Sequence, residues 1–369
     1  MKIALLELRR QPRRFGGAVA ILTLLGALLM LLGGLLDGLT EGGTNAITAQ
    51  RADLIVYSAN SGAKFAQSRI DPATAAVVAG TDGVTDTGAL NVVQLGARLP
   101  DSGPRDLVGV RLFGYEIPPA GVGAPPAAGE AYADVTLRDR GAQVGDVVLV
   151  GSQKSKVKII GFVPDTTYVL EPTLWANVET WSSIVGANRP SEQLGVGVSQ
   201  SLAVTVTGDP LAAASRIDAA TGGTTTTLTP AGVVEADKGV QSQNATFGGI
   251  IGITVLIAIV VIALFFALLT AERTGLYGVL KALGARSGAL FAGVVAQAVI
   301  LTLIASLIAT ALALALEVAL PPGVVPYSLS ATRVISSVGS LLLAAVVGCA
   351  FSLRRVLRID PASAIGGST

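Results

Sequence analysis

The residue types that usually perform enzymatic chemistry are scarce in this chain of 369 residues. It contains no histidine, the commonest general base and metal ligand, and a single cysteine, Cys349, so no intramolecular disulfide can form. No Gly-Lys pair occurs, which excludes the usual phosphate-binding loop, and neither a G-x-S-x-G motif nor a histidine-based zinc motif is present. We therefore predict a non-catalytic chain that holds no metal and no cofactor of its own.

Two charged residues stand where long apolar segments end, Glu317 and Arg333. We interpret them as anchors at a membrane interface; a catalytic pair is the weaker alternative. The interiors of the apolar segments contain no charged residue, whereas ion and proton pathways usually place one inside the membrane. The sequence thus predicts that the membrane-spanning part has a mechanical role and does not form a polar pathway through the membrane.

Four apolar segments are long enough to cross a membrane. The chain is 51% hydrophobic and 14% charged, against roughly 25% charged residues in soluble proteins. Because a spanning helix needs about 20 apolar residues, we predict spans at residues 16–36, 247–269, 288–316 and 333–353. The first segment exceeds the roughly 7–15 residues of a signal-peptide core and lacks a cleavage pattern. An uncleaved anchor is therefore favoured over a signal peptide.

The basic residues next to the spans predict the orientation. They cluster in residues 1–15, 270–287 and 354–369, whereas the short connection 317–332 contains no basic residue. All three basic segments lie on one side if both termini are cytoplasmic. Residues 37–246, with 14 basic and 21 acidic residues, then form a large domain outside the membrane.

This outer domain is predicted to be α+β, with two lobes. Two passages share the order strand, Asp-Pro, Ala-rich helix, strand, and Pro at the first helical position after Asp is a helix-start signal. They would form a split βαβ sheet; two unrelated helices that both begin with Pro are the alternative. The predicted elements are strand 53–58, helix 72–79, strand 84–95, strand 202–207, helix 210–220 and strand 224–228.

The residues between these passages are predicted to form the second lobe. Alternating apolar residues predict strands within 105–115, 144–151 and 156–162. The Pro/Gly-rich stretch 118–129 predicts a surface loop.

The segment that joins the second and third spans, residues 270–287, has amphipathic character. After a polar start, its apolar residues follow helical spacing, and Gly284 could end the helix as a cap. Taken alone, this pattern fits equally well an ordinary helix at the membrane surface.

The same segment carries the pattern E-R-x-x-x-x-x-x-L-K-A-L-G-A, from Glu272 to Ala285. This pattern resembles the signature of ABC-transporter permeases of the FtsX/MacB type, also called type VII. The resemblance implies that the segment is a coupling helix that docks on a separate ATP-hydrolysing subunit. The residues that would form this coupling site are Glu272, Arg273, Gly275, Leu276, Val279, Leu280, Lys281, Ala282, Leu283, Gly284 and Ala285.

Three further passages are similar to this family. Residues 8–14 resemble its amphipathic amino-terminal helix, and the end of the chain resembles its closing segment, centred on Asp360 and Pro361. Residues 52–58 resemble the DevC-type branch.

The resemblance implies a homodimer in a bacterial cytoplasmic membrane, with two ATPase subunits that bind ATP and Mg²⁺. It implies membrane lipid and an extracytoplasmic adaptor or hydrolase as further partners, and no nucleic acid. The outward extensions of the first two spans, residues 37–50 and 232–247, would act as stalks. Small residues suited to close helix contacts, with packing inside one chain as the alternative, are Gly248, Gly252, Ser340, Ala344 and Gly348.

Two functions fit this resemblance. One is export or extraction of a lipid, lipoprotein, peptide or drug, which the size of the outer domain favours. The alternative is mechanical regulation of an extracellular cell-wall hydrolase, as in FtsX.

Overall fold

The computed structural model describes residues 12–100, 102–103, 106–272, 279, 283, 287–320 and 325–356. The chain divides into two compact units. The helical unit comprises Met1–Gly38, Gln243–Pro321 and Tyr327–Thr369, and the α/β unit comprises Leu39–Ser242 and Pro322–Pro326.

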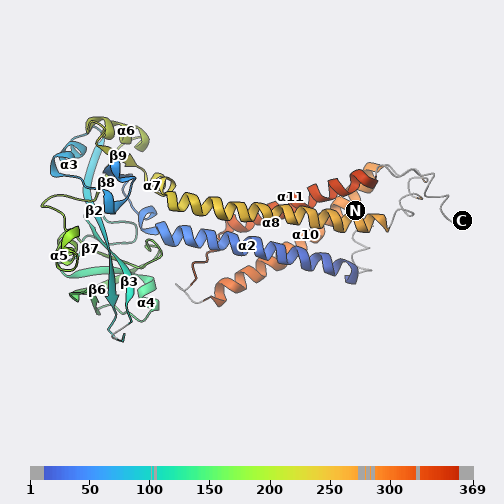
Figure 1. The fold of residues 1–369 in the computed structure, drawn as a ribbon, viewed down its shortest axis with the longest axis horizontal. Helices are drawn as coiled ribbons and strands as arrows, with labels where there is room; N and C mark the ends of the chain where they lie inside the picture. Colours follow the sequence, from blue (N-terminus) through green and yellow to red (C-terminus); the bar gives the residue numbers. More distant parts are fainter. Residues whose placement is uncertain are drawn as a thin grey trace. The chain divides into compact units, whose positions relative to one another are not determined.

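The long helices are α2 (Pro12–Thr48), α8 (Lys238–Ala271), α10 (Ser287–Ala319) and α11 (Ala331–Val356) (Figure 1). Each contains a stretch long and apolar enough to span a membrane. The predicted fold class, four spans with a mixed domain inserted between the first two, is confirmed.

Both α2 and α8 extend beyond the predicted spans. α2 continues without interruption to Thr48, so its last residues belong to the α/β unit. α8 begins at Lys238, where the carboxylate of Asp237 accepts hydrogen bonds from the N–H groups of Gly239 (2.6 Å) and Val240 (3.3 Å). Asp237 therefore caps α8, and residues 232–236 of the predicted second stalk belong to a separate helix, α7 (Pro230–Ala236).

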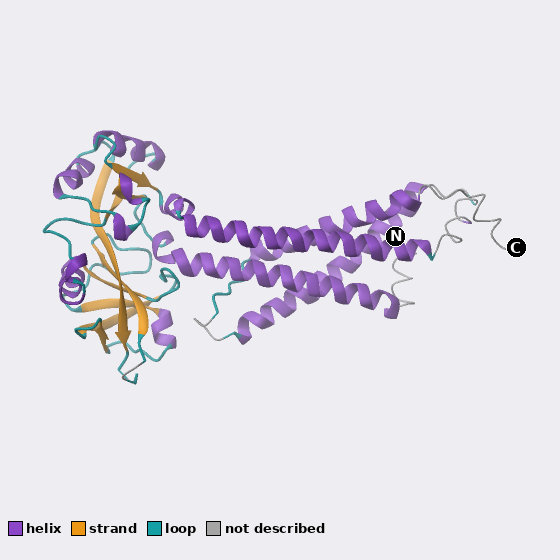
Figure 2. Ribbon diagram, viewed as in Figure 1, coloured by secondary structure: helices purple, strands orange, loops and turns teal. Residues whose placement is uncertain are grey.

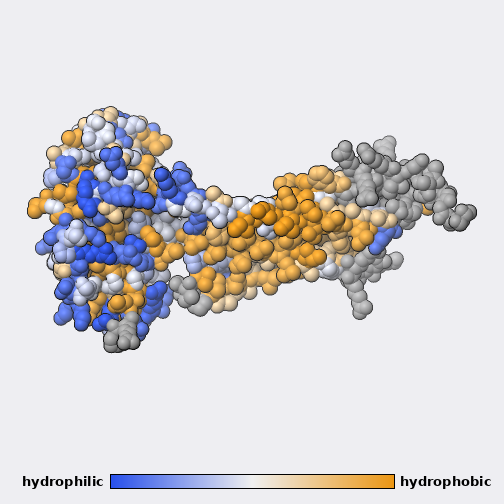
Figure 3. All heavy atoms as spheres, viewed as in Figure 1, coloured by the Kyte–Doolittle hydropathy of each residue, from blue (hydrophilic) through white to orange (hydrophobic). Residues whose placement is uncertain are grey.

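Small and aliphatic side chains form the core of the helical unit. Ala258 of α8, Ala305 of α10, and Ala344 and Ala345 of α11 are fully buried, which lets these helices pack closely. Large apolar side chains such as Leu256 remain exposed, and Figure 3 shows a largely hydrophobic surface along the helices. This surface fits a lipid environment.

The first part of the α/β unit is a four-stranded antiparallel sheet. Its strand order is β2-β8-β1-β9, and α3 and α6 connect its strands. The arrangement confirms the predicted pairing of two strand–helix–strand passages. The elements are β1 (Leu54–Ser58), α3 (Pro72–Ala79), β2 (Val84–Arg98), β8 (Ser201–Val206), α6 (Pro210–Ala220) and β9 (Thr225–Leu228).

The second part of the α/β unit is a closed ring of strands that includes β2. Figure 2 draws the strands of the unit in orange. The pairings run β2–β3–β7–β4–β6–β5 and return to β2, so these strands leave no open edge around the ring. The predicted second lobe therefore shares its longest strand with the first. The further elements are β3 (Val108–Tyr115), β4 (Glu130–Asp134), α4 (Val135–Asp139), β5 (Val147–Val150), β6 (Ser155–Val163), β7 (Thr173–Asn177) and α5 (Val178–Asn188).

Candidate functional site

Most of the predicted coupling segment lies outside the described residues. Of its members, Glu272 continues α8 by donating its N–H to Leu268 O (3.1 Å). Leu283 N–H donates to Val279 O (3.0 Å), which is one helical turn, and both side chains are exposed, at 79% and 56%. The residues outside the description are Arg273, Gly275, Leu276, Leu280, Lys281, Ala282, Gly284 and Ala285, together with Asp360 and Pro361.

The predicted packing residues occupy two different environments. Gly248 and Gly252 are exposed, and a Cβ atom on either would meet nothing within 4 Å. A Cβ on Gly348 would instead lie 2.8 Å from Ile259 O and 3.1 Å from Ala263 N of α8. Gly348 thus lies at a contact between two helices of the same chain, which is the alternative stated above for these residues. Gly248 and Gly252 of α8 instead leave an open surface.

Ser340 and Ala344 complete the predicted stripe on α11. Ala344 is fully buried in the helical core, and the half-buried Ser340 donates its hydroxyl to Ser336 O (2.8 Å) in its own helix. Neither residue offers a free polar group for a partner helix.

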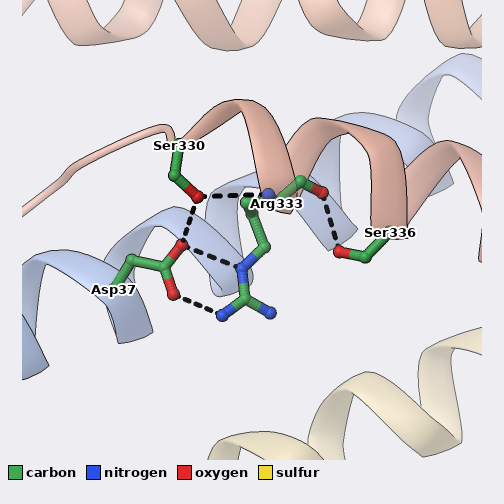
Figure 4. A network of polar contacts seen from close by, with 4 residues as sticks. All are labelled: Asp37, Ser330, Arg333 and Ser336. Carbon is green, nitrogen blue, oxygen red and sulfur yellow. Dashed lines mark hydrogen bonds and ion pairs between the residues drawn. The ribbon is translucent and has the colours of Figure 1, made fainter.

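Arg333 and Asp37 join α11 to α2 (Figure 4). Arg333 Nε donates to Asp37 Oδ2 (3.0 Å) and Nη2 donates to Asp37 Oδ1. Ser330 completes the group, because its hydroxyl donates to Asp37 Oδ2 (3.2 Å) and accepts from Arg333 N–H (3.1 Å). We call Asp37, Ser330 and Arg333 the clasp; such two-point charged contacts are the strong class of hydrogen bond.

The clasp bears on the weaker alternative for Glu317 and Arg333, a catalytic pair, whereas their role as interface anchors stays a prediction. Arg333 pairs with Asp37, whereas Glu317 Oε1 accepts from Leu329 N–H (3.3 Å). This geometry does not support a catalytic Glu317–Arg333 pair. The partner Asp37 was missed, since nothing in the local sequence links it to a residue 296 positions away.

Two consecutive glycines of α2 make room for the clasp. A Cβ on Gly33 would overlap Arg333 Cδ, and a Cβ on Gly34 would lie 2.5 Å from the ring of Tyr327. Gly34 O also accepts from Ser328 N–H (3.0 Å). The Gly-Gly pair therefore lets the start of α11 lie directly against α2.

In the α/β unit, the end of α2 is held by the loop between β6 and β7, residues 165–171, which we call the latch. Val169 N–H donates to Gly43 O and Leu170 N–H to Gly42 O, while Ala46 N–H donates to Thr167 O, each at 2.9 Å. A Cβ on Gly42 would lie 2.9 Å from Leu170 Cδ2. Glycine at this position thus permits the close approach of the loop.

The latch contains residues in an unfavourable backbone conformation. Asp165, Val169 and Leu170 have φ values of 53°, 51° and 61°. Non-glycine residues in this region cost about 1–3 kcal/mol each and persist only where their surroundings hold them.

The closed ring of strands holds the latch through Asp134, the last residue of β4, which is fully buried. Its Oδ2 accepts from the N–H (3.1 Å) and the hydroxyl (2.8 Å) of Thr166, and its Oδ1 accepts from Thr136 N–H (2.9 Å). Thr173 donates a further hydrogen bond to Thr166 Oγ1 (3.0 Å). This buried network determines where the latch begins.

Tyr168 holds the middle of the latch. Its ring packs edge-on against Phe65 (6.1 Å between centroids) and Phe113 (5.6 Å). Burial raises the pKa of Tyr168 to about 12, although the positive charge of Arg111 acts in the opposite direction. Arg111 itself forms an ion pair with Glu171 (2.6 Å), at the end of the loop.

Comparison with known proteins finds a family match in the helical part of the chain. Residues 248–361 match the FtsX-like permease C-terminal family. The periplasmic region of MacB from Actinobacillus actinomycetemcomitans is similar at 11% identity and a TM-score of 0.35, over 49% of this chain and 90% of that one. The extracellular domain of YknZ, a noncanonic ABC-type transporter from Gram-positive bacteria, is similar at 12% identity and a TM-score of 0.32, over 48% and 99%.

The family match begins within α8, at residue 248, and continues over α10, α11 and the connections between these helices. These are the segments that carry the predicted coupling site and closing motif, so the resemblance to FtsX-like permeases is confirmed there. The DevC-type likeness stays a prediction. Residues 248–361 are thus similar to the C-terminal region of FtsX-like permeases, in a chain with four described helices long and apolar enough to span a membrane.

Proposed function

We propose that this chain is the permease subunit of an ABC transporter in a bacterial cytoplasmic membrane, with both termini in the cytoplasm. The family match over residues 248–361 is the observation that carries this proposal. A separate ATPase would supply the energy, and the transported substrate would be a lipid, lipoprotein, peptide or drug. The match to FtsX-like permeases fits both candidate functions, and the size of the domain inserted between α2 and α8 leads us to favour transport over regulation of a cell-wall hydrolase.

The exposed turn at Val279 and Leu283 supports docking of a partner protein. Two apolar side chains four residues apart lie on one face of a helix, and both are exposed here. Their burial against the ATPase would remove apolar surface from water, at about 25 cal/mol per Å². The adjoining end of α8 would receive the movement of the docked subunit.

α2 is suited to transmit movement. The clasp holds it at Asp37 and the latch holds it at Gly42, Gly43 and Ala46. A helix held at two places moves as a rigid element, which is how domains commonly transmit conformational change. In this proposal two copies of the chain work together, and the open Gly248–Gly252 surface of α8 is available for their contact.

Co-purification tests the docking step. The full chain with Leu280→Asp and Leu283→Asp should lose its ATPase partner in a pull-down from membranes, while still inserting into the membrane. Leu211→Asp on α6, which is 67% exposed in the α/β unit, is the matched control and should keep the partner. Retention of the ATPase by the double variant would show that this segment is not the docking site.

A further inference from the structure

A cavity of about 490 Å³ lies between α3 and α5 in the α/β unit. Both helices contact β2 (Figure 1), and residues 193–199 form a further wall. Its size falls within the range of about 300–1,000 Å³ that ligand pockets have. The cavity is separate from the clasp, the latch and the coupling segment described above.

One wall of the cavity is formed where the pairing of β2 with β3 ends. Pairing with β3 ends at Leu90 and Tyr115. Beyond it, the carboxylate of Glu116 accepts from Ala89 N–H (2.6 Å), and Glu116 N–H donates to Ala89 O (3.2 Å). Glu116 thus takes the place of a strand residue, and its side chain is exposed at the rim of the cavity.

The negative charge of Glu116 favours a ligand that carries a positive charge. Among the described residues that line the cavity, Glu116 is the only charged one. A phosphate or carboxylate would meet repulsion without a compensating cation, whereas an ammonium group would be attracted. The remaining polar lining is neutral and suits amide groups: Thr87, Asn91, Ser182, Gln193 and Ser199.

The cavity also has an aromatic and aliphatic wall. Trp181 is 2% exposed, and its Nε1 has no acceptor among the described residues, an arrangement that costs about 1–3 kcal/mol. Ala75, Val178 and Leu202 provide the apolar part of the lining. An aliphatic side chain would fit against these residues.

We propose that this cavity binds the amino terminus of a short apolar peptide. The ammonium group pairs with Glu116, the peptide amides face the neutral polar lining, and an aliphatic side chain contacts the apolar wall. The inference goes beyond the proposed function and is independent of ATPase docking, because the cavity lies wholly within the α/β unit.

Calorimetric titration of the purified full chain, without an ATPase, tests the ammonium contact. The probes are the tripeptide amide Leu-Ala-Ala-NH₂ and its N-acetyl derivative. Acetylation of the peptide and the substitution Glu116→Gln should each weaken binding about tenfold or more, as expected for a charge-assisted hydrogen bond. The affinity for the acetylated peptide should be the same for the unchanged chain and for Glu116→Gln. Glu179→Gln on α5, an exposed carboxylate outside the lining, should leave binding unchanged.

A pair of neighbouring serines tests the location. Ser182→Phe should fill the cavity and abolish binding, whereas Ser183→Phe, outside the lining, should not. Equal binding of the free and acetylated peptides, or full binding by Ser182→Phe, would overturn the assignment, as would no binding at all. Equally tight binding of hexylamine would reveal an amine site and overturn the peptide assignment. None of these outcomes bears on the co-purification result, so the two proposals can fail separately.

Discussion

The two units hold α2 by different chemistry. In the helical unit the clasp relies on side chains, with a carboxylate, a guanidinium and a hydroxyl as the contacting groups. In the α/β unit the latch relies on backbone groups of Gly42, Gly43 and Ala46. A side-chain contact can be lost by one substitution, whereas a backbone contact survives substitutions that keep the loop conformation. The latch should therefore be sensitive to substitution of the residues that support it rather than of its own side chains.

The largest effect is expected from Asp134→Ala, which removes the support of the latch. The buried N–H and hydroxyl of Thr166 would lose their acceptor, at about 1–3 kcal/mol for each unsatisfied group. We expect destabilisation of about 3 kcal/mol in denaturant unfolding and faster hydrogen exchange at Val169 and Leu170. Asp139→Ala, an exposed position in α4, should change neither; if it matched Asp134→Ala, the latch would not depend on this network.

Loss of the clasp should rank second. Arg333→Ala leaves the carboxylate of Asp37, whose side chain is 19% exposed, without its cation. Hydrogen bonds to charged groups contribute about 1.5–3 kcal/mol, and we expect a loss of about 2 kcal/mol in the free energy of unfolding. Combination with Asp37→Ala should add little further loss in a double-mutant cycle. Strict additivity would show that the two side chains do not interact.

Substitution of two glycines in α11, Gly348 and Gly339, distinguishes the effect of close helix packing from the effect of helix propensity. Gly348→Ala places a methyl group against the backbone of α8, and overpacking typically costs about 1–3 kcal/mol. Gly339→Ala, where a methyl group would meet nothing within 4 Å, should be neutral or stabilise the helix by up to about 1 kcal/mol. Thermal unfolding of both variants in the same detergent would reveal the difference, and equal shifts would contradict the close contact.

The smallest effect, and one of opposite sign, is expected from Leu170→Gly. Glycine adopts the φ of 61° without strain and keeps the backbone N–H that reaches Gly42. We expect stabilisation by up to about 1 kcal/mol, because the Leu170 side chain is half exposed. The same change at Leu211, which lies in the first turn of α6 and has no positive φ, relieves no strain and should not stabilise. A loss of stability at both positions would mean that the Leu170 side chain matters more than its backbone.

Local signals explain which elements could be predicted. The bounds of α3 and α6 were predicted correctly because Asp71 and Asp209 cap them ahead of a proline. Asp71 Oδ1 accepts from Ala73 N–H (2.9 Å), and Asp209 Oδ1 accepts from Leu211 N–H (3.2 Å). Hydrogen bonds from Thr74, its backbone N–H foremost, also hold the pKa of Asp71 below its usual value.

Other elements carry no such signal. β4 and β7 were missed because each is five residues long and neither contains valine or isoleucine. Both are stabilised by partners that are distant in the sequence. The coupling segment was predicted by resemblance, and of its residues the structure describes Glu272, Val279 and Leu283.

The spans, the two capped helices and the repeated strand–helix–strand order followed from the sequence alone, since run length, caps and periodicity are local properties of the chain. Tertiary structure decided that β2 belongs to both lobes, that Arg333 pairs with Asp37 rather than Glu317, and that a loop after β6 holds α2. These contacts join segments far apart in the chain, and the last two depend on the close approach that Gly33, Gly34 and Gly42 allow. Nothing in the neighbouring sequence distinguishes these glycines from others, so only the packed fold reveals their role.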